Sequence, residues 1–103
     1  MNKRTKSLRV SAAVRKAVLE RDSFEGYPCC INCGEPGAHD MAHLIPRSLG
    51  GLGIPENIVN LCQKKCHHNF DRTSERENIL LWLEMYMREK YENWDEIERV
   101  YKK

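Results

Sequence analysis

Apolar residues recur with helical spacing near both ends of the chain. Near the N-terminus this spacing predicts a helix over about 12–21, which Ser11 can cap. In the C-terminal third it predicts a longer helix over about 75–91, with Ser74 and Glu77 as a capping box. The expected core stripe of this longer helix consists of Ile79, Trp82, Leu83 and Tyr86. A last short helix is expected near the C-terminus.

Between these helices, short alternating or β-branched segments predict strands. Residues 40–45 (DMAHLI) alternate and are followed by Pro46, and residues 57–62 (NIVNLC) form a second candidate strand. A loop over 47–56 with three glycines separates them. With 103 residues the chain is long enough for one core. The expected fold class is therefore α+β in a single domain.

Charge is unevenly distributed although the net charge is only +2. Residues 1–21 contain seven basic residues and one acid, whereas residues 74–103 contain eight acids and six bases. We expect residues 1–9 to be a flexible basic arm, followed by a single domain over 10–103. A basic end suggests a polyanionic partner, with nucleic acid the first candidate. A solvated tail without a partner is the alternative.

The first residues contain no apolar stretch of signal-peptide length. The longest apolar run, over 79–83, is too short to cross a bilayer. A cytoplasmic, intracellular location is therefore expected. In a reducing compartment, clustered cysteines are more often metal ligands than disulfides.

Four of the five cysteines form two closely spaced pairs. Cys30 and Cys33 form a CxxC pair followed by Gly34, and three residues separate Cys62 from Cys66. Both spacings fall within the range of zinc ligands. Four thiolates complete a tetrahedron and leave no open position, so the expected metal is a structural Zn²⁺. A redox dithiol or plain buried cysteines are the alternatives, and Cys29 is a weaker rival to Cys30.

Three motifs lie between and beside the cysteine pairs: AHLIPRSLGG with His43, ENIVNLC with Asn57, and CHHNFD with His67. In this order, over residues 30–71, the sequence resembles the HNH nuclease family. The resemblance implies a small ββα-metal domain, with a two-stranded antiparallel hairpin, a zinc site and flanking helices over 75–103. It also implies a metal-dependent endonuclease that hydrolyses DNA. Short standalone members are common in phages, where some act alongside packaging machinery.

By this resemblance the catalytic residues are His43, Asn57 and His67. A histidine suits the base that activates water, because its pKa lies near neutrality. The Asn57 amide can bond the loop backbone and hold the loop of His43 in place. A simple turn asparagine and Asn60 are the alternatives for this role.

His67 and Asp71 are four residues apart at the start of a helix, so both side chains emerge on one face. They can hold Mg²⁺ or Mn²⁺ as the catalytic ion. His68 is the alternative ligand, although its partner four residues later is Arg72, which repels a cation.

One position departs from the family pattern. Many members carry an aspartate or histidine directly before the catalytic histidine, as a further metal ligand, and here that position is Ala42. Asp40 and His39 lie nearby in the sequence, and whether either replaces the ligand is left open.

Basic residues around these motifs can hold DNA phosphates without reading sequence. They are Lys3, Arg4, Lys6, Arg9, Arg47, Lys64 and Lys65. A homodimer is suggested by four apolar residues beyond the needs of one core face, Leu80, Leu81, Met85 and Met87. Packing under neighbouring helices is the alternative for them. The rival functions are a non-catalytic zinc module that binds nucleic acid, and a thiol redox or zinc-sensing protein.

Overall fold

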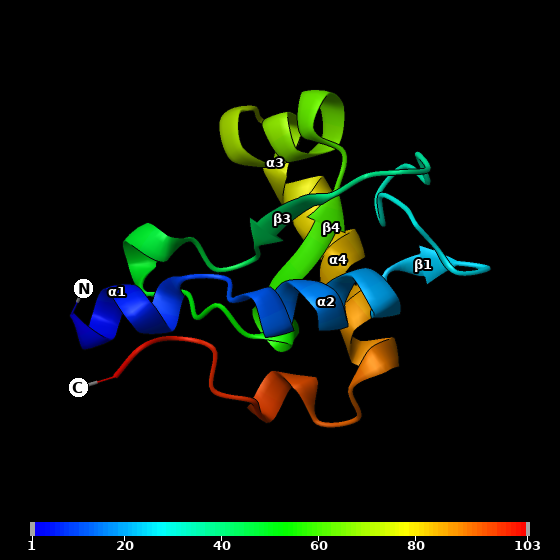
Figure 1. Ribbon diagram of the computed structural model, residues 1–103. Helices are drawn as coiled ribbons and strands as arrows, with labels where there is room; N and C mark the ends of the chain where they lie inside the picture. Colours follow the sequence, from blue (N-terminus) through cyan, green and yellow to red (C-terminus); the bar gives the residue numbers. More distant parts are fainter. Residues whose placement is uncertain (1, 103) are drawn as a thin grey trace.

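The computed structural model describes residues 2–102 and has an antiparallel strand pair at its centre with helices around it (Figure 1). The helices are α1 (Lys3–Leu8), α2 (Ala12–Arg21), α3 (His68–Arg72) and α4 (Arg76–Lys90). The strands are β1 (Ser23–Phe24), β2 (Tyr27–Pro28), β3 (Asp40–His43) and β4 (Ile58–Leu61). The predicted α+β class is confirmed. Within residues 2–102, no helix has the length and apolar character needed to cross a membrane.

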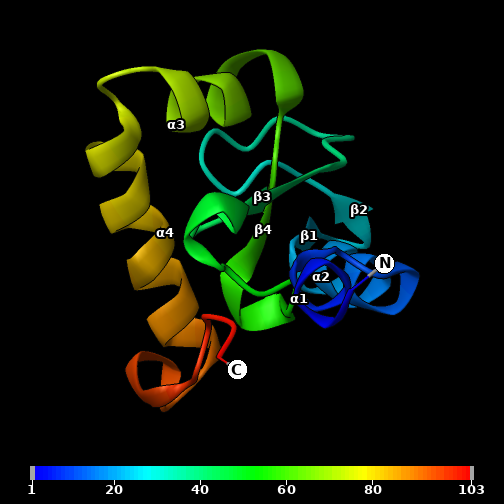
Figure 2. The same ribbon diagram turned by 90° about the vertical axis from the view of Figure 1, so that its left-hand side faces the viewer.

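Strands β3 and β4 are covered on both faces. They run antiparallel, with Asp40 opposite Leu61. Because successive side chains of a strand point to opposite faces, Val59 and Leu61 join the cluster under α4, whereas Ile58 packs with Val18 of α2. Figure 2 shows α4 and α2 on opposite sides of the pair. Every residue of β4 is consequently buried.

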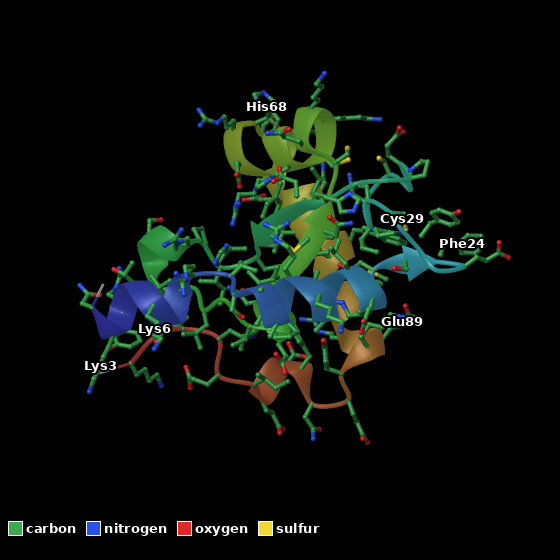
Figure 3. All side chains as sticks on the ribbon, in the orientation of Figure 1. Lys3, Lys6, Phe24, Cys29, His68 and Glu89 are labelled. Carbon is green, nitrogen blue, oxygen red and sulfur yellow. The ribbon has the colours of Figure 1, made fainter. Side chains whose placement is uncertain are left out.

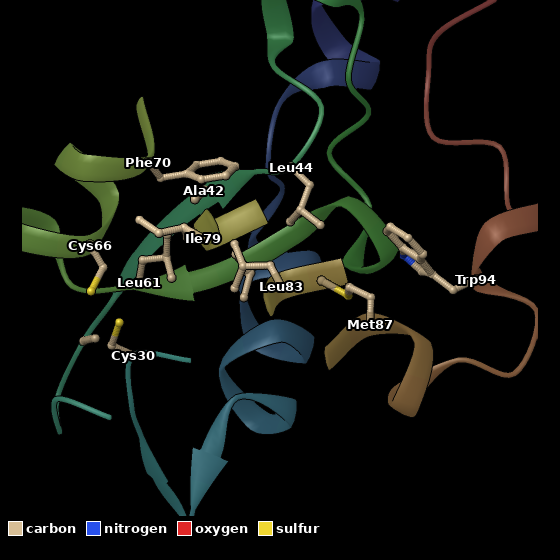
Figure 4. Packing of buried hydrophobic residues seen from close by; sticks show 12 residues of the cluster. Cys30, Ala42, Leu44, Leu61, Cys66, Phe70, Ile79, Leu83, Met87 and Trp94 are labelled. Carbon is tan, nitrogen blue, oxygen red and sulfur yellow. The ribbon is translucent and has the colours of Figure 1, made fainter. Parts of the chain in front are cut away.

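The larger hydrophobic cluster extends along α4 and reaches the cysteines (Figure 4). Trp94 lies at one end of it, and Cys30 and Cys66 lie at the other. The buried residues between them are Ala38, Ala42, Leu44, Val59, Leu61, Phe70, Ile79, Leu83 and Met87. The cysteine pairs are therefore an extension of the core, and their arrangement is coupled to the packing of the whole cluster.

A buried ion pair joins the end of α2 to β4 and α4. The Arg21 guanidinium donates to Asp22 and to the carbonyl oxygen of Ile58, at 2.6 Å. The fully buried Asp22 carboxylate also accepts from the backbone N–H of Asn60 and from the Tyr86 hydroxyl. A buried charge is tolerated only when it is paired and hydrogen-bonded, so this network fixes α2 against the sheet.

The first predicted helix has its predicted cap, but the second does not. The Ser11 hydroxyl accepts a hydrogen bond from the backbone N–H of Val14, at 3.1 Å. The capping box of Ser74 and Glu77 is wrong, because no side chain caps α4, which begins at Arg76. The last predicted helix is only a single 3₁₀ turn, directly before the C-terminal segment.

The buried face of α4 also differs in part from the predicted stripe. Ile79 and Leu83 are buried as predicted, and Met87 is buried beside them. Trp82 is instead 51% exposed and donates its indole N–H to the carbonyl of Ile31. Its amphipathic ring covers the loop of the first cysteine pair rather than the core.

The four apolar residues of α4 that exceed the needs of one core face are divided between the interior and the surface. Leu80 packs against the main cluster and Met87 is fully buried. Leu81 and Met85 are 61% and 60% exposed. The alternative of packing inside therefore applies to two of the four residues, and the other two remain available to a partner.

The N-terminal segment is a correction to the sequence prediction. Residues 3–8 form α1 rather than a flexible arm, and Leu8 is 2% exposed. The end of this segment packs closely against the loop that contains Gly53, where an added Cβ would lie 2.1 Å from the carbonyl oxygen of Arg9. A single apolar residue carries no periodicity, so the sequence pattern did not predict this docking.

The C-terminal segment closes over the loop between β3 and β4. Leu52 donates its N–H to the carbonyl of Arg99, and Tyr101 donates to the carbonyl of Gly50, each at 2.8 Å. These two bonds tie the loop to the C-terminal segment. Figure 1 shows this segment (red) running back toward the N-terminus.

Candidate functional site

The four cysteines of the two pairs converge. The Sγ atoms of Cys30, Cys33, Cys62 and Cys66 all lie within 4.8 Å of one another. The Sγ atoms of Cys33 and Cys62 are 3.7 Å apart. In a zinc tetrahedron with Zn–S bonds of about 2.3 Å, sulfurs are about 3.8 Å apart. The cluster is therefore consistent with a structural Zn²⁺ site.

Local backbone geometry brings each pair together. Gly34 has a φ of +83°, and its N–H bonds the carbonyl of Cys30 at 2.7 Å, which closes the CxxC turn. After Cys62 the chain makes a wide π turn over Gln63–His67, closed by a bond from the His67 N–H to the Cys62 carbonyl. This wide turn accommodates the extra residue between the second pair.

The thiols of the cluster differ in their pKa shifts. Burial raises the pKa of both Cys30 and Cys66. At Cys62 burial acts in the same direction, but hydrogen bonds from Cys66 and the other thiols outweigh it, so the pKa falls. A metal ion binds thiolates, so a bound ion would offset the cost of ionising the two buried thiols. Cys29 lies outside the cluster, which settles the choice between it and Cys30.

A second feature is a cleft of about 510 Å³ beside β3. It gathers residues from α2, β3, the turn after β3, and α3. The lining residues are Val10, Arg15, Asp40, Met41, His43, Pro46, Arg47, Ser48, His67 and Asp71. Two of the three predicted catalytic residues and both predicted ligands of the divalent ion therefore share one cavity.

His43 is half-buried at the end of β3, and its ring nitrogen Nε2 lies 2.8 Å from the carbonyl oxygen of Leu8. Because a carbonyl can only accept, Nε2 carries the proton, and Nδ1 is the nitrogen with a free lone pair in the neutral ring. Burial, with a further contribution from Arg47, lowers the pKa of His43. Burial outweighs the bond to Leu8, which raises the pKa, so the net shift favours the neutral ring.

Asn57 lies beneath this loop and is fully buried. Its Oδ1 accepts from the N–H of Ile45 at 2.9 Å, and its Nδ2 donates to the carbonyls of Ile45 and Leu52. The predicted contact between Asn57 and the loop backbone is thus present, two residues after His43. Asn60 makes no such contact, because its amide donates to Cys29 and Ala38.

His67 lies between two carboxylates. Its Nδ1 is 2.5 Å from Oδ2 of Asp40, and its Nε2 is 3.0 Å from Oδ2 of Asp71. His68 is exposed and does not line the cleft, and Figure 3 shows it on the outer side of α3. The structure therefore favours His67 over His68 as the candidate ligand.

Ala42, at the departure from the family pattern, is fully buried in the main cluster. His39 is exposed and its ring bonds the carbonyl of Gly37, so it does not replace a ligand there. Asp40 lines the cleft and contacts His67.

The predicted DNA-contacting residues fall into three groups. Arg47 lines the cleft. Lys3, Arg4 and Lys6 project from α1, which lies beside it, and the Arg4 guanidinium donates to the carbonyl of Arg47 (Figure 3). Arg9 directly follows α1 and is exposed. Lys64 and Lys65 instead lie beside the cysteine cluster, in a separate cavity with Cys33 and Cys62.

Two groups at this site were not predicted from the sequence. Arg15 of α2 lines the cleft and donates to the carbonyl of His39, at 3.2 Å. The Leu8 carbonyl fixes the tautomer of His43. Arg15 could have been found as the base on the exposed face of its helix, but a backbone carbonyl has no signal in the sequence.

No protein-family model matches the chain, and no curated protein matches it at a significant level. The cleft and the cysteine cluster are therefore the features of the molecule that indicate a function.

Proposed function

We propose that this protein is a metal-dependent endonuclease of the HNH type, which hydrolyses DNA phosphodiester bonds. The observation that carries the proposal is the convergence of His43, His67 and Asp71 in one cleft. His43 comes from β3, and His67 and Asp71 come from the π turn and α3, more than twenty positions later. The cleft places a histidine with a lowered pKa beside a histidine–carboxylate pair.

In the proposed reaction His43 is the general base. Its Nδ1 accepts a proton from water, while the Leu8 carbonyl accepts the hydrogen bond from Nε2–H and stabilises the imidazolium that forms. Asn57 acts through the backbone, because it holds Ile45 and so fixes the end of β3. The water attacks phosphorus in line with the leaving 3′ oxygen, which gives 5′-phosphate and 3′-hydroxyl ends.

His67 Nε2 and Asp71 are the residues that would hold a divalent ion, Mg²⁺ or Mn²⁺. Imidazole and carboxylate suit such ions. The ion would stabilise the charge on the phosphate and the leaving oxygen. With Ala42 in the core, the protein supplies few ligands, so we expect weak ion binding.

Positive charge on both sides of the cleft supports a polyanionic substrate. Arg15 and Arg47 line it, and α1 adds Lys3, Arg4 and Lys6 nearby. We propose that these residues hold phosphates of the DNA backbone. The four cysteines would hold a structural Zn²⁺ that fixes the start of α3 and therefore the position of His67.

The test is cleavage of supercoiled plasmid across a Mg²⁺ and Mn²⁺ series. His43→Ala should lose at least about 10²-fold in rate and should not recover at high Mn²⁺, because the base and not the ion site is lost. His67→Ala should instead raise the metal concentration needed for half-maximal rate. His68→Ala is the matched control, since this neighbour lies outside the cleft, and should cut at the parental rate.

A second candidate is a zinc-containing module that binds nucleic acid without cutting it. The observation in its favour is Ala42, which replaces a metal ligand of active HNH enzymes with a buried core residue. DNA binding without cleavage in any metal, or equal cleavage by His43→Ala and the parent, would establish this candidate in place of the nuclease.

A further inference from the structure

We infer that Asp40 is a positioning residue for the divalent ion, and that it acts through His67 rather than by binding the ion. The inference rests on the proposed function, because it concerns the same cleft. An Asp40 that orients His67 would strengthen ion binding at a site where position 42, an alanine, supplies no ligand.

The position of Asp40 is set by the sheet. It begins β3 and pairs with Leu61, directly before Cys62. Strand pairing therefore places Asp40 close to the cysteine cluster. Its Oδ2 lies 2.5 Å from Nδ1 of His67. His67 follows Cys66 at the other end of the π turn, so both partners are held from the cysteine side.

The two nitrogens of His67 have different partners. Both nitrogens face a carboxylate, but the contact of Nδ1 with Asp40 is the shorter, 2.5 Å against 3.0 Å from Nε2 to Asp71. With an ion between Nε2 and Asp71, Nε2 would give its lone pair to the ion and Nδ1 would donate its proton to Asp40. Metal-binding histidines commonly donate their second nitrogen to a carboxylate, which fixes the tautomer and raises the basicity of the ligand.

The same geometry excludes Asp40 as a ligand alongside this pair. An ion shared by Nε2 and Asp71 lies at the Nε2 edge of the imidazole, whereas Asp40 occupies the Nδ1 edge. Asp40 and Ala42 lie on the same face of β3, two positions apart. Position 42 therefore offers no ligand, and the carboxylate of Asp40, two residues earlier, instead orients His67 as a ligand.

The test measures ion binding directly, by the loss of the free Mn²⁺ signal in electron paramagnetic resonance, with zinc content and melting temperature as checks of folding. Asp40→Ala should weaken Mn²⁺ binding about 10- to 100-fold, the usual effect of removing such a partner. Asp40→Asn should retain part of the affinity, because its amide oxygen can still accept from Nδ1–H. Glu35→Gln, at an exposed carboxylate near the cysteines, is the matched control and should bind like the parent.

A double-mutant cycle separates positioning from ligation. If Asp40 acts only through His67, Asp40→Ala should cause no further loss of Mn²⁺ affinity in a His67→Ala background. A further loss there, or parental affinity in Asp40→Ala alone, overturns the inference while the proposed function stands, provided that Asp71→Ala still weakens binding. A parent protein that binds no Mn²⁺, or an Asp71→Ala variant that binds normally, overturns the ion site itself and the inference with it.

Discussion

Replacement of Asn57 tests whether one buried amide organises the loop beside His43. Asn57→Ala removes three hydrogen bonds and leaves the N–H of Ile45 and the carbonyls of Ile45 and Leu52 without these partners. Each unsatisfied buried group costs about 1–3 kcal/mol, and the three costs are not additive because the loop can relax. We therefore expect the free energy of unfolding to fall by about 3–5 kcal/mol, a large part of the stability of a small domain.

Asn57→Asp makes the test sharper, because it preserves the shape of the side chain. One carboxylate oxygen can still accept from Ile45 N–H, but the other faces the two carbonyls and repels them. At pH 7 the loss should be at least as large as for Asn57→Ala. Protonation turns that oxygen into a donor, so the deficit relative to the parent should shrink as pH falls toward about 4.

The assay is urea unfolding at pH 7 and pH 5, with zinc content measured on the same samples. Asn78→Asp is the matched control, an exposed asparagine on α4, and should change stability by less than about 0.5 kcal/mol. An Asn57→Ala variant within about 1 kcal/mol of the parent would refute the reasoning, since the loop would then be held by its other contacts.

Four further outcomes are expected. Elemental analysis should find one zinc per chain, and its removal by a chelator should cost on the order of 10 kcal/mol of folding free energy; metal-free protein that melts normally contradicts this. Deleting residues 1–9 should flatten the salt dependence of DNA binding, and it should also slow cleavage because the Leu8 carbonyl that bonds His43 is lost. An unchanged salt slope excludes the segment from the DNA interface. Because burial lowers the pKa of His43, the cleavage rate should rise with pH and reach half its plateau below the usual histidine value, and a midpoint above that value contradicts the base assignment. Light scattering should detect a dimer that Leu81→Glu, at an exposed apolar residue of α4, dissociates; a monomeric parent rejects it.

Local patterns in the sequence determined most of the elements. The alternation over 40–45 and the β-branched run over 57–62 correspond to β3 and β4, and the helical spacing corresponds to α2 and α4. The CxxC spacing and the following glycine bring the thiols of the first pair together by local geometry, whereas the meeting of the two pairs depends on the core that both of them join.

Predictions about helix ends and exposed helix faces were wrong in part, because both depend on tertiary contacts. Capping and burial at a helix end depend on what packs there, so Thr73 rather than Ser74 bonds the backbone before α4. Trp82 fits a helical stripe, yet tertiary packing uses it to cover Ile31. α1 carries one buried residue, too few to form a pattern.

The candidate site combines both kinds of information. The resemblance to the HNH family singled out His43 and His67 as candidates, and the four-residue spacing on one helix face added Asp71. Only the tertiary structure decided how the histidines are held. The partner of His43 is the carbonyl of Leu8, which is 35 positions away, and the partner of His67 Nδ1 is the carboxylate of Asp40 on β3, which is 27 positions away. Such contacts follow from the packing of α1 and α3 against β3, and hydrogen bonds between segments distant in the chain leave no periodicity for a sequence pattern to show.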